Sequence, residues 1–140
     1  MEERLIKVGI THGDINGIGY EVILKTFSDA RVAELCTPVI YGSSKIAAYH
    51  RKALELPPVN MNIISQAEDA GINRVNIINC VDDETKVELS QSTSIAGEAA
   101  FLALEAAVTD LKRGAVDVLL TAPINKHNIQ NDEFHFPGHT

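Results

Sequence analysis

The sequence predicts a layered α/β domain with a largely parallel sheet, and three observations support this fold class. Short apolar runs rich in valine and isoleucine alternate with longer segments of helical periodicity. A glycine-rich loop joins the first of these runs to the first helical segment. Several runs are apolar along their whole length, which is typical of strands buried on both faces. An order of strand, helix and strand is that of a parallel sheet with helices packed on it.

The first half of the chain supplies two pairs of a strand and a helix. The run from Leu5 to Ile10 is short and β-branched at its end, which favours a strand. Ser43 or Ser44 can cap the second helix, and Pro57 with Pro58 would end it. We therefore expect a strand over residues 5–10, a helix over 20–27, a strand over 38–42 and a helix over 45–54.

The second half is dominated by one long apolar helix, from about Thr93 to Lys112, with Gly114 suited to the position after its end. Its many alanines let another backbone approach closely, so we expect cover on more than one side. A sheet and a neighbouring helix, the favoured reading, or a partner subunit could supply that cover. Strands are expected over residues 62–64, 75–78 and 117–120, and an edge strand over 86–89 is possible in an otherwise polar stretch.

Composition indicates one soluble domain and excludes two classes of partner. The chain has 140 residues, of which 45% are hydrophobic and 22% charged, and its net charge is -7. A negative chain with scattered basic residues is not expected to bind nucleic acid. No segment approaches the roughly 20 apolar residues of a membrane span, and no signal peptide is visible. Cys36 and Cys80 are expected to be reduced thiols, so we expect a cytoplasmic protein.

The first loop that could carry chemistry runs from Thr11 to Glu21. Ligands of open α/β sheets gather beyond the carboxyl ends of strands, where loops present backbone N–H groups. This loop is neither a GxGxxG nor a Walker A motif, and its glycines could serve only to turn the chain. His12 is more simply a loop histidine than a catalyst, whereas Asp14 could cap the following helix or face a ligand.

Two further segments carry candidate ligand-binding residues. The segment 121–126 runs from a strand toward an expected short helix, and its Lys126 could contact an anion or remain solvated. At residues 136–140, Gly138 permits close backbone approach, and His139 and Thr140 offer donors suited to phosphate. The five histidines match no standard zinc spacing, so no complete metal site is expected in this chain.

Taken together, these segments resemble the family of 4-phosphohydroxy-L-threonine dehydrogenases. The family shows I-T-x-G-D/E-P-x-G-I-G-P-E, then T-x-P-x-x-K, then F-x-G-H-T-E, and the matching stretches here are residues 10–21, 121–126 and 136–140. Three motifs in the same order are far more specific than one. Ile15 and Tyr20 replace prolines of the usual pattern, which we expect to change loop rigidity more than chemistry.

The resemblance implies a fold, a reaction and cofactors. The fold is like that of isocitrate and isopropylmalate dehydrogenases, with two domains and a homodimer whose active site lies between domains. Family members are about twice as long as this chain, so residues 1–140 would be the amino-terminal α/β portion of the enzyme. The implied reaction oxidises and decarboxylates 4-phosphohydroxy-L-threonine to 3-amino-2-oxopropyl phosphate. It uses NAD or NADP and a divalent metal such as zinc, magnesium or cobalt.

The resemblance also implies roles for individual residues. His139 and Thr140 would contact the substrate, most simply at its phosphate, and Asn125 and Lys126 would lie near it. The loop carrying Gly13, Asp14, Gly17 and Gly19 would lie beside the cofactor. The family's metal-binding histidines and most of its dinucleotide site come later than residue 140, so the 140-residue chain alone is expected to be inactive. Two alternatives are a phosphate-binding module without catalysis and a related dehydrogenase for another phosphorylated or hydroxylated acid.

Overall fold

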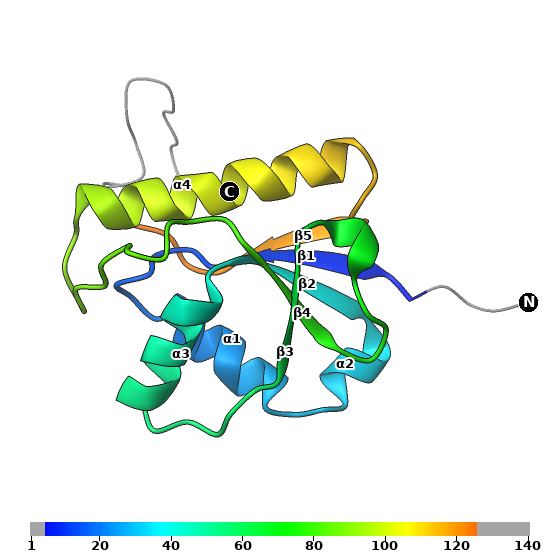
Figure 1. Cartoon of the computed structure of the whole chain (residues 1–140), viewed down its shortest axis with the longest axis horizontal. Helices are drawn as coiled ribbons and strands as arrows, with labels where there is room; N and C mark the ends of the chain where they lie inside the picture. The colour runs from blue at the N-terminus through cyan, green and yellow to red at the C-terminus, as the bar shows by residue number, and fades with distance from the viewer. Residues whose placement is uncertain (1–4, 126–140) are drawn as a thin grey trace, which may run out of the picture.

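Five parallel strands form one sheet in the order β3-β4-β2-β1-β5 in the computed structural model, which describes residues 5–125. Figure 1 shows the sheet near the middle of the molecule. Neighbouring strands pair in parallel throughout, so the expected parallel sheet is confirmed. The strands are β1 Lys7–Thr11, β2 Thr37–Gly42, β3 Met61–Ile64, β4 Val75–Asn79 and β5 Val118–Thr121.

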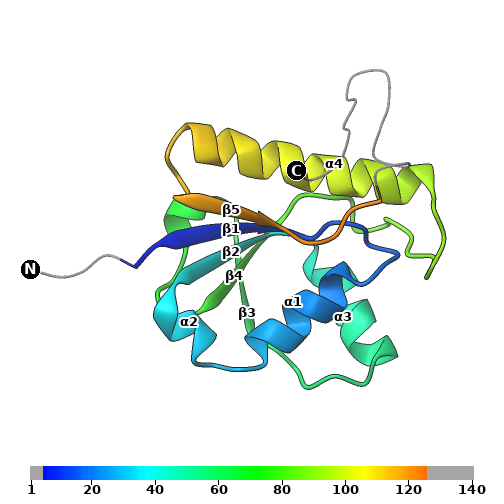
Figure 2. The ribbon, with the colours of Figure 1, turned by 180° about the vertical axis from the view of Figure 1, so that it is seen from behind.

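Helices cover both faces of this sheet and give the expected α/β/α layering. One long helix lies on one face and three shorter ones lie on the other, as the opposite views in Figures 1 and 2 show. The helices are α1 Gly19–Phe27, α2 Val32–Leu35, α3 Ser44–Ala53 and α4 Ser94–Lys112, with a 3-10 turn η1 at Ala67–Asp69. None of the helices within residues 5–125 is long and apolar enough to cross a membrane.

The alternation of side chains along β2 divides the core between the two faces. Ile40 packs with residues of α1 and α3, whereas Val39 and Tyr41 pack with Ala103 and Ala107 of α4. Successive residues of a strand point to opposite faces, so a strand buried on both sides must be apolar at every position. All six residues of β2 are buried, which explains why only its first residue, Thr37, is polar.

Helix α4 lies close to the sheet because its buried face is made of small residues. These are Ala96, Gly97, Ala99, Ala100, Ala103 and Ala107. The Thr93 hydroxyl caps the helix by accepting a hydrogen bond from the Ala96 N–H at 3.1 Å. Gly114 follows the helix end with φ +80°, as expected. We expected a second element to pack on the outer side of α4, but residues 5–125 supply none. On that side Ile95 is 46% exposed and Leu111 36% exposed.

One local expectation was wrong. Residues 86–89 form no strand, because the Gly loop bonds the backbone around them instead: the Glu88 N–H donates to Asn16 Oδ1 at 2.7 Å, and the Ser90 N–H donates to the Asn16 carbonyl at 2.8 Å. Residues 122–125 are not helical, and the short helix expected to carry Lys126 lies outside the described residues, so it stays a prediction. The short elements α2 and η1 were not expected, since three or four residues are too few to show periodicity.

Candidate active site

The loops that follow β1 and β5 touch each other at the carboxyl edge of the sheet. The Asp14 N–H donates to the Pro123 carbonyl at 2.8 Å, and the Ala122 N–H donates to the Thr11 carbonyl at 3.1 Å. Gly13 has φ +66°, and a Cβ there would lie 2.6 Å from the Ala122 carbonyl oxygen and overlap that of Pro123. Glycine is required at this position for both reasons. Two segments more than one hundred residues apart in the sequence thus form one surface (Figure 1).

Gly19 allows helix α1 to begin directly against the end of β1. A Cβ at this position would overlap the His12 carbonyl oxygen and contact the Ala122 side chain at 3.5 Å. Any side chain would therefore push the start of α1 away from the two loops. Gly13 and Gly19 were noted in the sequence as loop glycines. Each lies where the main chain packs directly on another main-chain carbonyl, at residues 122–123 and at His12 respectively.

A cleft of about 400 Å³ opens beside this loop. Asp14 and Gly17 from the first loop and Asn125 from the second all border it, so the structure brings together three of the residues predicted to lie near a ligand. Gly13 and Gly19 shape the loop without lining the cleft. The other lining residues are Asn16, Ile18, Glu21, His50, Ala53, Leu54, Leu89, Ser90, Gln91 and Ser92.

The polar lining of the cleft consists of carboxylates, amides, hydroxyls and one imidazole. Asp14 and Glu21 supply the carboxylates, and no Lys or Arg lines it within the described part of the chain. Glu21 is paired with Lys25 at 2.7 Å, so the Asp14 carboxylate is the main charge that would repel a phosphate group here. Sugar hydroxyls and amides would find acceptors. The cleft thus suits the uncharged polar parts of a ligand better than a phosphate.

Asp14 does not cap helix α1. The helix begins after Ile18, which makes no side-chain capping bond, and Asp14 Oδ1 instead accepts the Asn16 N–H at 3.0 Å. This turn fixes the carboxylate at the edge of the cleft, where it is half-buried. Of the two expectations for Asp14, capping is wrong, and a position facing a ligand-sized cleft remains.

His12 is buried and structural, which the sequence did not reveal. Its Nε2 bonds the Ala99 carbonyl at 2.9 Å, and its Nδ1 bonds the Tyr20 hydroxyl at 2.7 Å. Burial lowers the pKa of His12 to about 4, although the bond to Ala99 works in the opposite direction. The imidazole is therefore neutral at pH 7, with Nε2 as the donor to the carbonyl and Nδ1 as the acceptor from Tyr20.

His50 reaches the same loop from helix α3. Its Nε2 donates to the Ile15 carbonyl at 2.6 Å, and its ring stacks on Tyr20 with centroids 5.4 Å apart. Burial lowers the pKa of His50, while the bond to Ile15 and the nearby Asp14 charge oppose that shift. Both histidines are thus engaged in the protein, and within residues 5–125 no three His, Cys, Asp or Glu side chains are grouped to hold a metal.

Asn16 ties the Gly loop to the segment before α4 and was also missed by sequence reasoning. Its amide donates to the Gln91 carbonyl at 3.0 Å and to the Thr93 hydroxyl at 3.3 Å, and its side-chain oxygen accepts the Glu88 N–H. The residue is only 2% exposed. An asparagine between glycines usually indicates a turn, so no signal in the sequence marked it as the link that closes this side of the cleft.

Three predicted site residues, Lys126, His139 and Thr140, lie outside the described residues. Their roles at the substrate stay predictions. Asn125 is the last described residue, and it borders the cleft beside the Gly loop.

Comparison with known proteins gives consistent results. Over all 140 residues the chain is 60% identical to a 4-hydroxythreonine-4-phosphate dehydrogenase of Bacteroides thetaiotaomicron, and it spans 38% of that protein's length. It is 32% identical to a D-threonate 4-phosphate dehydrogenase of Cupriavidus necator, of which it spans 42%. The crystal structure of a 4-hydroxythreonine-4-phosphate dehydrogenase from Burkholderia phymatum superposes with a TM-score of 0.84 at 28% identity, covering 98% of this chain and 42% of that one.

The model of one protein family matches residues 34–140, which is most of the chain. This match does not extend to the Gly loop, whereas the Bacteroides relative aligns with the whole chain. The fold, the geometry of the two loops and these matches agree, and the chain belongs to the family of the pyridoxal phosphate biosynthetic protein PdxA.

Proposed function

We propose that the protein carrying this chain is a 4-phosphohydroxy-L-threonine dehydrogenase, acting on the compound also called 4-hydroxythreonine 4-phosphate. It would oxidise the secondary alcohol with NAD or NADP and release carbon dioxide, giving 3-amino-2-oxopropyl phosphate. The observation that carries the proposal is the 60% identity, over the whole chain, to the Bacteroides dehydrogenase of that name. Residues 1–140 would form the amino-terminal α/β part of a two-domain, cytoplasmic homodimer.

The cleft beside the Gly loop supports a role in binding the nicotinamide cofactor. When bound, the nicotinamide would accept the hydride that the alcohol carbon loses. Asp14 and the amide and hydroxyl groups of Gln91, Ser90 and Ser92 fit the ribose hydroxyls and carboxamide of such a cofactor. The absence of basic side chains from the described lining argues that phosphate groups lie elsewhere. The substrate phosphate is accordingly proposed to bind at His139 and Thr140.

A divalent metal would stabilise negative charge that develops on the substrate oxygen. The residues described here do not offer a ligand set for it, because His12 and His50 have their Nε2 atoms committed to backbone carbonyls. We therefore assign the metal to residues outside the range 5–125, and the family resemblance implies histidines later than residue 140. The contribution of residues 5–125 would be to hold the cofactor cleft in shape.

The test is an assay of the protein expressed from its gene at natural length. Purified protein is mixed with 4-phosphohydroxy-L-threonine, NAD or NADP and a divalent metal, and both NADH or NADPH absorbance and released carbon dioxide are measured. Turnover with both products in equal amounts is expected.

A substrate panel separates the proposal from its nearest rival. D-threonate 4-phosphate is included because one relative is a dehydrogenase named for it. Preference for that compound, judged by kcat/KM, would replace the proposed substrate with another phosphorylated hydroxy acid. Phosphate-ligand binding without any turnover would instead favour a binding module.

A further inference from the structure

An unbroken chain of hydrogen bonds passes through Tyr20 and joins four segments of the fold. The Ser43 N–H donates to the Tyr20 oxygen at 2.8 Å, the Tyr20 hydroxyl donates to His12 Nδ1, and His12 Nε2–H donates to the Ala99 carbonyl. The bonds at the two ends have fixed directions, because a carbonyl and a backbone N–H each have only one role. The Tyr20 hydroxyl also lies 3.3 Å from the Ser43 carbonyl, which is a longer contact than its 2.7 Å bond to the neutral His12 Nδ1. All members are buried, so each bond is worth more than it would be in water.

The same tyrosine also supports the second histidine that holds the Gly loop. The Tyr20 ring stacks on His50 at an interplanar angle of 21°, and His50 bonds the Ile15 carbonyl. His12 and Ile15 lie on either side of Gly13 and Asp14, so the loop is held at both ends by imidazoles in contact with one phenol. The fit around the phenol is tight, since a Cβ at Gly42 would overlap the Tyr20 hydroxyl and lie 2.8 Å from His12 Nδ1.

We propose that Tyr20 is a positioning residue for the cofactor cleft: through His12 and His50 it fixes the Gly loop so that Asp14 and Gly17 face the ligand. This inference rests on the proposed function, since it treats the cleft as part of a dehydrogenase site. Tyr20 itself does not line the cleft, so its effect on a ligand must pass through the loop.

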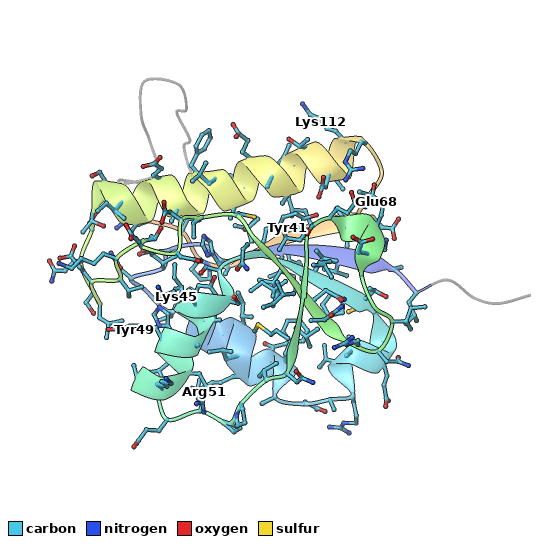
Figure 3. All side chains as sticks on the ribbon, viewed as in Figure 1. Tyr41, Lys45, Tyr49, Arg51, Glu68 and Lys112 are labelled. Atoms are coloured by element: carbon cyan, nitrogen blue, oxygen red, sulfur yellow. The ribbon has the colours of Figure 1, made fainter. Side chains whose placement is uncertain are left out.

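The competing interpretation is that Tyr20 only stabilises the core, and a second buried tyrosine provides the matched control. Tyr41 is 1% exposed and its hydroxyl donates to Asp110 Oδ2 at 2.6 Å, between the sheet and α4. Figure 3 shows Tyr41 below α4, on the opposite side of the sheet from α3 with its labelled Tyr49. Tyr20→Phe and Tyr41→Phe each remove one buried hydroxyl, but only the first touches the loop.

The experiment compares these two variants at natural length by amide hydrogen exchange and by steady-state kinetics. In Tyr20→Phe the Asp14, Gly17 and Ser90 amides should exchange roughly fivefold faster than in the parent, because the buried hydrogen bonds that join the Tyr20 hydroxyl to His12 and Ser43 are lost. KM for the nicotinamide cofactor should rise about threefold to tenfold with kcat and the substrate KM within about twofold. Tyr41→Phe should change neither quantity.

A second variant, His50→Phe, tests the same inference in case Tyr20→Phe fails to fold. His50→Phe keeps the ring stacked on Tyr20 but removes the donor to the Ile15 carbonyl, so it should reproduce the faster exchange at Gly17. Equal loop exchange in Tyr20→Phe and Tyr41→Phe, or a cofactor KM that does not move, overturns the inference. If the parent shows no turnover but the loop exchange changes as expected, the positioning of the loop stands and only the proposed reaction is lost.

Discussion

The Gly loop owes its shape to buried residues that would be ordinary on a protein surface. His12 and Asn16 are 0% and 2% exposed, and each connects the loop to the region around the start of α4. Burying an imidazole without charge requires that both ring nitrogens find partners, and His12 satisfies this with one donor and one acceptor bond. The shape of the loop therefore depends on the protonation state of a side chain that does not line the cleft.

This dependence predicts a loss of stability in mildly acidic solution. The folded pKa of His12, about 4, lies below its ordinary value of 6.5, so the unfolded chain binds more protons between these values. Stability is fully present above pH 6.5 and declines as the pH falls toward the folded pKa. Between pH 7 and pH 5 the free energy of unfolding should drop by about 2 kcal/mol from His12, and His50 acts in the same direction.

Urea titrations at the two pH values measure this change, and the matching NMR titration of the His12 ring protons identifies its source. The acidic residues whose pKa values are lowered, Asp29 and Glu68, lose their stabilisation only at lower pH and do not obscure the window. A His12 signal that titrates near 6.5 would contradict the assignment.

Two glycines with positive φ, one in a tight contact and one in open space, allow two contributions to stability to be measured separately. One is the steric clash of an added Cβ, and the other is the strain of a left-handed backbone. Gly13→Ala should destabilise the protein by more than about 3 kcal/mol, because it combines a left-handed residue with overlap against the 122–123 carbonyls. Gly114→Ala is the control, since Gly114 has φ +80° and a Cβ added there would meet nothing within 4 Å, and it should lose only about 1 kcal/mol. Thermal or urea unfolding measures both, and equal losses would show that the two loops do not press on each other.

At the residue scale, the sequence predicted the cleft only in part. Gly13, Asp14, Gly17, Gly19 and Asn125 could be proposed because glycines and polar residues after strands mark ligand loops. The roles of His12, Tyr20 and Asn16 could not be, because each depends on a partner 8 to 87 residues away in the sequence. Nothing local distinguishes such a histidine from one exposed on a loop.

Helix α4 shows how an element can both cover the sheet and close the site. Its alanine face lies on the strands, and its N-cap Thr93 receives hydrogen bonds from the Ala96 N–H and from the Asn16 amide at 3.3 Å. One hydroxyl therefore caps the start of the helix and anchors the Gly loop. This double use links the stability of α4 to the shape of the cleft.

Removing the hydroxyl of the N-cap residue Thr93 should destabilise the protein more than a replacement that keeps the hydroxyl. Thr93→Ala is expected to lower the free energy of unfolding by about 1–2 kcal/mol, since it leaves the Ala96 N–H without its acceptor. Thr93→Ser keeps the hydroxyl and should stay within about 0.5 kcal/mol of the parent. Urea unfolding measures the free energy of unfolding of both variants. An equal decrease in the two would assign the effect to the lost methyl group instead of the hydroxyl.

Elements with strong periodic or capping signals were predicted within one or two residues. The helix expected from Thr93 to Lys112 is observed as Ser94–Lys112, and the strand expected over 38–42 as Thr37–Gly42. The expected strand over 86–89 failed because its backbone groups bond Asn16, a tertiary contact that no local pattern encodes.

For the whole molecule, the described residues form one side of a site. The cleft offers carboxylates, amides and hydroxyls but no basic side chain in residues 5–125, and no metal ligand set is found in that part of the chain. The chain also spans 38% of the length of its Bacteroides relative. The 140-residue chain can therefore fold and form its cleft while still lacking groups that catalysis needs.

The corresponding prediction is that the 140-residue chain produced alone has no NAD-dependent turnover of 4-phosphohydroxy-L-threonine. The measurement is NADH formation with a divalent metal present, beside the natural-length protein as the positive control and with circular dichroism to verify that the chain is folded. Turnover by the folded 140-residue chain would show that the catalytic groups lie within it.

The position of β1 in the sheet has a consequence for how the chain folds. β1 is the first strand in the sequence, yet its loop is completed by Ala99, 87 residues after His12, and its backbone end is held by Asp117, 110 residues after Lys7. Contacts between such distant residues carry a large loop-closure entropy and form late in folding. During synthesis, β1 and β2 can pair early, but the Gly loop must wait until α4 and β5 have been made. The cleft is thus expected to be among the last parts of the domain to acquire its native shape.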